Sequence, residues 1–351
     1  MNELRRIWLE FDQEGRKAWS SLLRSAGLTP QLGLDYTVGV FRGGELLATG
    51  SLSGRIIKEV AVRSDERQGG LLATVVQALF DRLSEEGRDD HAFVYTKPDT
   101  APYFRSLGFH HVASTPVVHL MECGHPDLND YLASLGAKAH PGSPVASVVV
   151  KADPPTLGHL HLIDRAAKDN AVVYLFVLSA QDTTFNAQER LGLVRGMVAD
   201  RTGVVVLSTS DYLVSATTFP SYFLKDRVPS AVAAAQASVD ACIFKDSIAP
   251  RLSIARRYVG TEPLSPVTAI YNRELKRIFQ GHPELIVLPR LELNGRVVSA
   301  GTVRKAIDAG DKKAVRSLCP DSVASYIIRT RMQGTRDQAG ESHRPSRRNH
   351  G

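Results

Sequence analysis

The chain has 351 residues, of which 43% are hydrophobic and 23% charged, and this balance is that of a folded globular protein. The length suggests two domains rather than one core, and the composition excludes a fibrous or wholly disordered chain. No apolar run reaches the length of a membrane helix, and the N-terminus does not read as a signal peptide. Because Cys123, Cys242 and Cys319 are widely separated, we expect a cytoplasmic protein without disulfides or membrane attachment.

The formal net charge of +6 is concentrated at one end of the chain. Residues 331–351 contain five arginines and two carboxylates and almost no apolar residues. Such a segment cannot offset its ordering entropy by burial, so we predict a disordered basic tail over 331–351. The remaining charge is too small and too dispersed for a dedicated nucleic-acid-binding protein.

The first part of the chain, residues 1–125, has the pattern of an α+β domain. β-rich runs and helical spacing alternate, and the run 56–62 leads through a glycine pair into an amphipathic helix that begins at Leu71. The Gly- and Pro-rich residues 126–142 then read as a linker that contains one short helix. Strands are expected at 36–41, 45–53, 56–62, 92–96 and within 110–121, with a short helix after Pro98.

The second part, residues 143–330, alternates strands and helices in the βαβ manner. Apolar runs such as 145–150 are typical of strands that are buried on both faces, so we predict a Rossmann-like, mostly parallel sheet. Ligands of such sheets bind at the carboxyl ends of the strands. Strands are expected at 145–150, 172–178, 204–207, 257–259 and 285–288, and helices at 158–168, 188–198, 267–279, 300–309 and 322–329.

The most informative segment, residues 151–163, directly follows the first of these strands. Its Asp153-Pro-Pro sequence favours an extended loop, and Gly158 permits a tight turn into the helix. Thr156 and His159 then flank the helix N-terminus, where free N–H groups attract phosphate. The alternative is that Thr156 is an ordinary N-cap and His159 a surface histidine.

Two motifs in the chain resemble those of class I nucleotidyltransferases, which attack the α-phosphate of ATP. Thr156–His159 matches the T-x-G-H form of the first motif, and 298–304 stands in the place of the second, I-S-(S/T)-T-x-x-R, from which it departs at Gly301. Further segments resemble the citrate (pro-3S)-lyase ligase family, and that resemblance covers the chain except for its tail. The segments are 94–109, 218–226, 255–272 and 286–304.

The resemblance implies an acetyltransferase-like domain followed by a nucleotidyltransferase domain, and a two-step reaction. Acetate attacks ATP to give acetyl adenylate and pyrophosphate. The thiol of a phosphoribosyl-dephospho-CoA group on the citrate lyase acyl carrier subunit then takes the acetyl group and releases AMP. Mg²⁺ is implied only as the ion that ATP carries, and the sequence offers no metal site of its own.

The same resemblance suggests roles for ten residues. His159, Thr156, Arg304 and Lys225 are the candidates for catalysis through contacts to the phosphates, since fixed cations and donors suit a leaving pyrophosphate. The candidates for nucleotide binding are Asp153, Gly158, Gly260, Glu262, Ser299 and Thr302. Ser299 and Thr302 would look the same if they only capped a helix.

Three questions stay open on the sequence alone. Gln68-Gly69-Gly70 resembles half of an acyl-CoA pyrophosphate loop, but Leu71 and Leu72 follow, and a side chain there would block it. This domain therefore either binds acetyl-CoA or only docks the carrier. The whole protein could instead be a coenzyme adenylyltransferase of the pantetheine-phosphate or nicotinate type, or a non-catalytic regulator that binds the acyl carrier.

Overall fold

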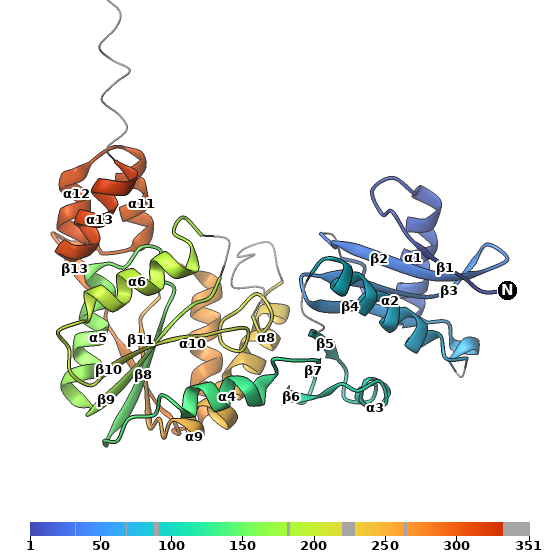
Figure 1. Cartoon of the computed structure of the whole chain (residues 1–351), viewed down its shortest axis with the longest axis horizontal. Helices are drawn as coiled ribbons and strands as arrows, with labels where there is room; N and C mark the ends of the chain where they lie inside the picture. Colours follow the sequence, from blue (N-terminus) through green and yellow to red (C-terminus); the bar gives the residue numbers. More distant parts are fainter. Residues whose placement is uncertain are drawn as a thin grey trace, which may run out of the picture. The chain divides into compact units, whose positions relative to one another are not determined.

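The computed structural model describes residues 1–31, 33–67, 69–87, 91–180, 183–219, 229–262 and 265–332 (Figure 1). The chain divides into two compact units. Unit 1 comprises Met1–Lys138 and Thr217–Ile248, and unit 2 comprises Ala139–Ala216 and the chain from Ala249 onward. The sequence suggested two consecutive domains with a linker at 126–142. The units differ from that division, because the segment 217–248 groups with the N-terminal part.

Unit 1 is built on a seven-stranded sheet with the order β1-β2-β3-β4-β5-β7-β6. Its neighbours are antiparallel except β4 and β5, which run parallel and pair at Ile56–Phe93 and Ile57–Val94. The α+β class predicted for this part is confirmed by this mixed sheet. The strands are β1 (Glu3–Arg6), β2 (Tyr36–Arg42), β3 (Glu45–Ser53), β4 (Ile56–Val62), β5 (Ala92–Thr96), β6 (His110–Ser114) and β7 (His119–Cys123).

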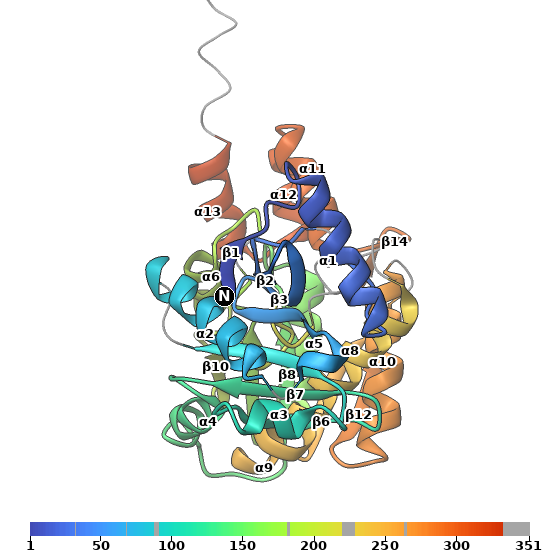
Figure 2. The ribbon, with the colours of Figure 1, turned by 90° about the vertical axis from the view of Figure 1, so that its right-hand side faces the viewer.

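Two long helices, α1 (Gln13–Ser25) and α2 (Leu71–Glu85), pack on opposite faces of this sheet (Figures 1 and 2). Gly70 adopts a left-handed conformation (φ 72°) at the N-cap of α2, where a side chain would be strained. Leu71 does not block the adjacent loop, because its side chain is buried in the core beneath α2, whereas Leu72 is only partly buried against that core. Shorter helices of this unit are η1 (Ser64–Glu66), α3 (Ala101–Arg105) and α4 (Leu128–Gly136).

The segment that joins unit 1 from the second half of the chain forms α8 (Ser230–Ile243) and the π-helical turn η3 (Phe244–Ile248). Helix α8 contacts β6. Its buried Asp240 accepts a hydrogen bond from the Thr218 hydroxyl (2.7 Å), and the Tyr95 hydroxyl lies 2.8 Å from the carbonyl oxygens of Thr217 and Thr218. The Tyr95 hydrogen bonds and the packing of α8 on β6 link the segment to the N-terminal part of unit 1.

Unit 2 contains a five-stranded, wholly parallel sheet with the order β10-β9-β8-β11-β12. The chain moves outward from β8 in one direction and then returns to β11 on the other side of it. This reversal is the switch point at which such sheets bind ligands. The predicted parallel α/β class is confirmed. The strands are β8 (Val145–Val150), β9 (Val172–Val177), β10 (Val204–Ser208), β11 (Arg256–Gly260) and β12 (Glu284–Leu288).

Alternate residues of β8 and β9 pack on α5, α6 and α13 in one apolar core. The core extends to Met332, which is 4% exposed, so the predicted disordered tail does not begin at 331; residues 333–351 lie outside the described part of the chain. In that part, no helix is long and apolar enough to cross a membrane. The remaining elements are α5 (Leu157–Asp169), α6 (Ala187–Met197), α9 (Ala249–Arg251), α10 (Pro266–Phe279), β13 (Glu292–Leu293), β14 (Arg296–Val297), α11 (Ala300–Asp308), α12 (Lys312–Leu318) and α13 (Asp321–Arg331).

Candidate active site

The loop between β8 and α5 is fixed by two buried charged residues. The Asp153 carboxylate accepts hydrogen bonds from the backbone N–H groups of Thr184 (3.3 Å) and Phe185 (3.0 Å). Arg190 donates to the carbonyl oxygen of Lys151 (2.7 Å) and to two others on the neighbouring loop. Burial lowers the pKa of Arg190, and the Asp153 charge opposes that shift. Asp153 therefore shapes the loop, and its carboxylate is already engaged.

The N-terminus of α5 carries a reciprocal cap made by Thr156 and His159. The Thr156 hydroxyl caps the His159 backbone N–H (3.4 Å), and the backbone N–H of Thr156 donates to Nδ1 of His159 (3.0 Å). A backbone N–H can only donate, so Nδ1 must be the acceptor and the proton of the neutral ring lies on Nε2. Thr156 is thus an N-cap, as one alternative had it, but His159 is not a surface histidine. Among the described residues its Nε2–H has no hydrogen-bond partner.

His159 is half-buried, and its environment disfavours the charged ring. Burial and, to a smaller extent, the nearby Arg290 guanidinium lower its pKa from 6.5 to about 4. The ring is consequently neutral near pH 7. It can offer a hydrogen bond to a phosphate, but it does not bring a positive charge.

Gly158 brings the two sequence motifs together. Gly158 lies in the first turn of α5 and does not have a positive φ. A Cβ at this position would lie 3.2 Å from the carbonyl oxygen of Val298, closer than most real contacts. The absence of a side chain lets Val298, the first residue of the second motif, approach the first turn of α5.

The second motif forms the start of α11 and reaches back to the first. Ser299 is the N-cap, accepting from the Thr302 backbone N–H (3.1 Å), and the two hydroxyl oxygens lie 2.8 Å apart. Arg304 donates to the Asp153 carbonyl oxygen and lies 3.6 Å from its carboxylate. The Arg304 side chain as a whole is about one-third exposed (36%). Arg304 thus links the second motif to the loop that leads into the first, across 151 positions of sequence.

The ends of β11 and β12 supply a third group of residues. Glu262 is almost fully buried and accepts from the Ser265 backbone N–H (3.1 Å) and from Arg290. Arg290 also donates to the Thr261 carbonyl oxygen (2.8 Å), and Asn272 holds the Gly260 carbonyl oxygen (3.0 Å). Sequence reasoning missed Arg290. Its place in the sequence could have indicated it, because it follows by two residues a strand that ends at the ligand-binding edge of the sheet.

Two further expectations concern Lys225 and metal ions. Lys225 lies outside the described residues. The carboxylates of Asp153 and Glu262 are both engaged by protein donors. In unit 1, His125, Asp127 and Asp130 do place ligand atoms within 4.8 Å of one another, although the sequence spacing suggested no such cluster. Asp127 and Asp130 form the capping box of α4, which accounts for their proximity.

A parallel sheet with two capped helix N-termini at its switch point, one of them carrying Arg304, is the architecture of an α/β domain of the nucleotidyltransferase type. The family model described as the citrate lyase ligase C-terminal domain matches residues 145–327. The citrate (pro-3S)-lyase ligase of Escherichia coli (strain K12) is 33% identical over 326 residues, which are 90% of this chain and 92% of that protein. The chain therefore belongs to the citrate lyase ligase family and is an enzyme of that family.

Two other similarities are more limited. The phosphopantetheine adenylyltransferase of Cutibacterium acnes is 42% identical over 64 residues, 18% of this chain and 41% of that protein. The crystal structure of Escherichia coli ElaA covers 35% of this chain and 99% of its own, at 14% identity and a TM-score of 0.31. The family assignment rests on the near full-length relative.

Proposed function

We propose that this protein uses ATP to activate acetate as acetyl adenylate and then acetylates the thiol of a prosthetic group on the acyl carrier subunit of citrate lyase. The observation that carries the proposal is the junction of the two motifs at the switch point of the sheet. The contacts at this junction connect three groups that can bind phosphate. They are the Nε2–H of His159, the N-terminus of α5 and the partly exposed Arg304.

This set fits a triphosphate because it supplies donors and a fixed cation without proton transfer from the protein. A neutral ring with its proton on Nε2 donates to a phosphate oxygen at any pH well above its pKa of about 4. Arg304, held by Asp153, is suited to the charge that grows on the leaving pyrophosphate. The Ser299 and Thr302 hydroxyls stand at the second helix N-terminus and extend the same phosphate-binding surface.

The nucleoside would lie toward Gly260 and Glu262 at the end of β11. Arg290 orients Glu262 there and also sets the charge environment of His159. We therefore assign Arg290 as a positioning residue that links the nucleoside side of the site to the phosphate side. Gly158 and Asp153 are assigned the same kind of role for the two motifs, because their contacts are to protein groups.

In the first step an acetate oxygen forms a bond to the α-phosphorus of ATP, and the bond from that phosphorus to the β-phosphate bridging oxygen breaks. In the second step the thiol sulfur attacks the acetyl carbonyl carbon, loses its proton, and AMP leaves with the mixed-anhydride oxygen. Neither step needs a covalent enzyme intermediate. The protein contributes positioning and electrostatic stabilisation of the phosphate charge.

The direct test is exchange of labelled pyrophosphate into ATP. We expect exchange that requires both acetate and Mg²⁺, followed by acetylation of the carrier with release of AMP. The absence of exchange with acetate and with every other short carboxylate would overturn the ligase proposal.

The short match to a phosphopantetheine adenylyltransferase favours one second candidate, transfer of the adenylyl group to a phosphorylated pantetheine. The same assay separates the two. Exchange that depends on phosphopantetheine and ignores acetate would identify the adenylyltransferase, whereas exchange that depends on acetate alone identifies the ligase.

A further inference from the structure

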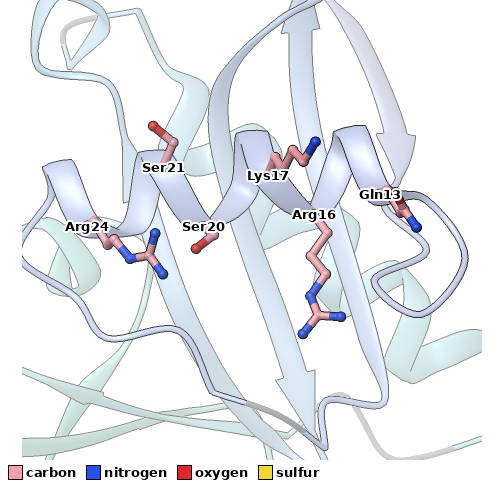
Figure 3. A pocket seen from close by; sticks show the side chains of 6 residues that line it. All are labelled: Gln13, Arg16, Lys17, Ser20, Ser21 and Arg24. Carbon is pink, nitrogen blue, oxygen red and sulfur yellow. The ribbon is translucent and has the colours of Figure 1, made fainter.

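One face of α1 is a stripe of polar and cationic side chains (Figure 3). The helix buries Gly15, Trp19, Leu22 and Leu23 against the sheet of unit 1. The residues of the opposite face recur at spacings of three and one, as expected for a single side of a helix. This α1 stripe lines a shallow depression of about 650 Å³ and consists of Gln13, Arg16, Lys17, Ser20, Ser21 and Arg24.

The charges of the stripe are not neutralised by the described part of the chain. Arg16, Lys17 and Arg24 are exposed, and no described carboxylate lies within ion-pair distance of any of them. Other arginines of unit 1 do have such partners: Arg42 pairs with Glu66, and Arg63 pairs with Glu45 and Asp65. The stripe therefore presents three cations whose countercharges have to come from outside the described chain.

The layout of the stripe indicates the shape of its partner. From residue 13 to residue 24 a helix rises about 16 Å, so the cations are spread along a line. A small anion would reach one or two of them, whereas a second helix with acidic side chains three and four residues apart can meet all three. Every lining side chain is polar, which suits an association that forms quickly and dissociates again.

We propose that the α1 stripe docks an acidic helix of the acyl carrier subunit during acetyl transfer. The inference rests on the proposed function, because only a carrier that arrives, accepts the acetyl group and leaves needs such a transient surface. Charge attraction of this kind mainly accelerates encounter and weakens as salt screens it.

The test compares two triple charge reversals in the full-length chain. The first is Arg16→Glu, Lys17→Glu, Arg24→Glu. The matched control is Lys97→Glu, Arg105→Glu, Lys138→Glu, three exposed cations of the same unit that also have no ion pair among the described residues and do not share one helix face. Acetyl transfer is measured against carrier concentration at about 0.05 M and about 0.5 M salt. Pyrophosphate exchange and thermal unfolding are measured in parallel.

We expect both variants to keep wild-type exchange and unfolding temperature. The stripe variant should show a KM for the carrier raised about tenfold or more at low salt, with the difference shrinking at high salt, and the control should stay within about twofold. A stripe variant with an unchanged KM, or a control with the same loss, would overturn the proposal.

A small thiol acceptor tests the shape argument. With dephospho-CoA in place of the carrier, the stripe variant should transfer acetyl groups at the wild-type rate. An equal loss with the small thiol would mean that the stripe binds phosphates of the prosthetic group, which contradicts docking of a helix. If the wild-type chain shows no acetate-dependent exchange at all, the proposed function fails instead.

Discussion

His159 has two separable duties, and two substitutions distinguish them. Its Nδ1 accepts the Thr156 backbone N–H, and its Nε2–H is the proposed phosphate donor. His159→Ala removes both. His159→Glu keeps an acceptor at the third position of the helix, where glutamate completes the same kind of capping box, but it has no N–H to donate. The pair therefore isolates the donor from the fold.

The structure sets the size of each effect. Loss of the cap in His159→Ala should cost about 1 kcal/mol of unfolding free energy, which lowers Tm by about 2–4 °C for a unit of this size. His159→Glu should unfold near the wild-type temperature, because a carboxylate is favoured at a helix N-terminus. Both variants should lose about two or more orders of magnitude in adenylation, the usual scale for one preorganised donor.

The pH dependence of stability gives a second signature of this residue. The pKa of His159 is about 4 in the folded chain, whereas an unperturbed histidine, as in the unfolded chain, has a pKa of 6.5. The unfolded chain therefore binds more protons between these values, and stability falls as pH drops through that window. Between pH 7 and pH 5, protonation linked to His159 alone lowers the free energy of unfolding by about 2 kcal/mol. His159→Ala escapes that loss, so it should be less stable than wild type at pH 7 and no less stable at pH 5.

Adenylation is measured by pyrophosphate exchange, and stability by denaturant unfolding at the two pH values. A glutamate variant that exchanges as fast as wild type would refute the donor role. An alanine variant that unfolds far below the expected temperature would show instead that His159 is mainly a packing residue. Equal pH dependence of alanine and wild type would contradict the low pKa.

Three further predictions follow from the same contacts. Gly158→Ala should lower the free energy of unfolding by about 1–3 kcal/mol and slow pyrophosphate exchange, because its Cβ would crowd the Val298 carbonyl oxygen. The control is Gly301→Ala, whose Cβ would lie 3.7 Å from its nearest neighbour and which should leave the unfolding free energy unchanged. Arg290→Gln should raise the pKa of His159, measured by NMR titration of the ring; an unchanged pKa would contradict their coupling. A fragment that begins at Ala139 still carries α8 without the rest of unit 1, so it should bind a hydrophobic dye or aggregate, and a monodisperse fragment without dye binding would refute the division into units.

The sequence predicted the sheet of unit 2 and its motifs because the signals there are local. A continuous apolar run such as Val145–Val150 indicates a strand buried on both faces without knowledge of the strands beside it. A helix that follows such a strand directly has its N-terminus at the end of the strand. The capping partners were also readable, since Thr156 and Ser299 each stand three residues before the group that they cap.

The contacts that were missed are long-range. Helix α8 is rich in alanine and has little amphipathic pattern, so its sequence does not reveal that it packs in unit 1. Arg290 gains its importance from Glu262 and His159, which are 28 and 131 positions away. Helix α1 was also not predicted, although Asp12 as an N-cap and the helical spacing of Trp19, Leu22 and Leu23 are local signals for it.

The boundary of the C-terminal tail provides the last prediction. A chain that ends at Thr330 loses Met332, whose side chain is packed in the core of unit 2, and the 2.8 Å ion pair between Arg331 and Glu189. Removing a buried methionine should cost about 2–3 kcal/mol, and the half-exposed ion pair should add less than about 1 kcal/mol. A chain that ends at Met332 keeps both contacts and serves as the control. We expect the shorter chain to unfold several degrees below the control. Equal unfolding temperatures would show that the core of unit 2 already ends by Thr330, as the sequence alone suggested.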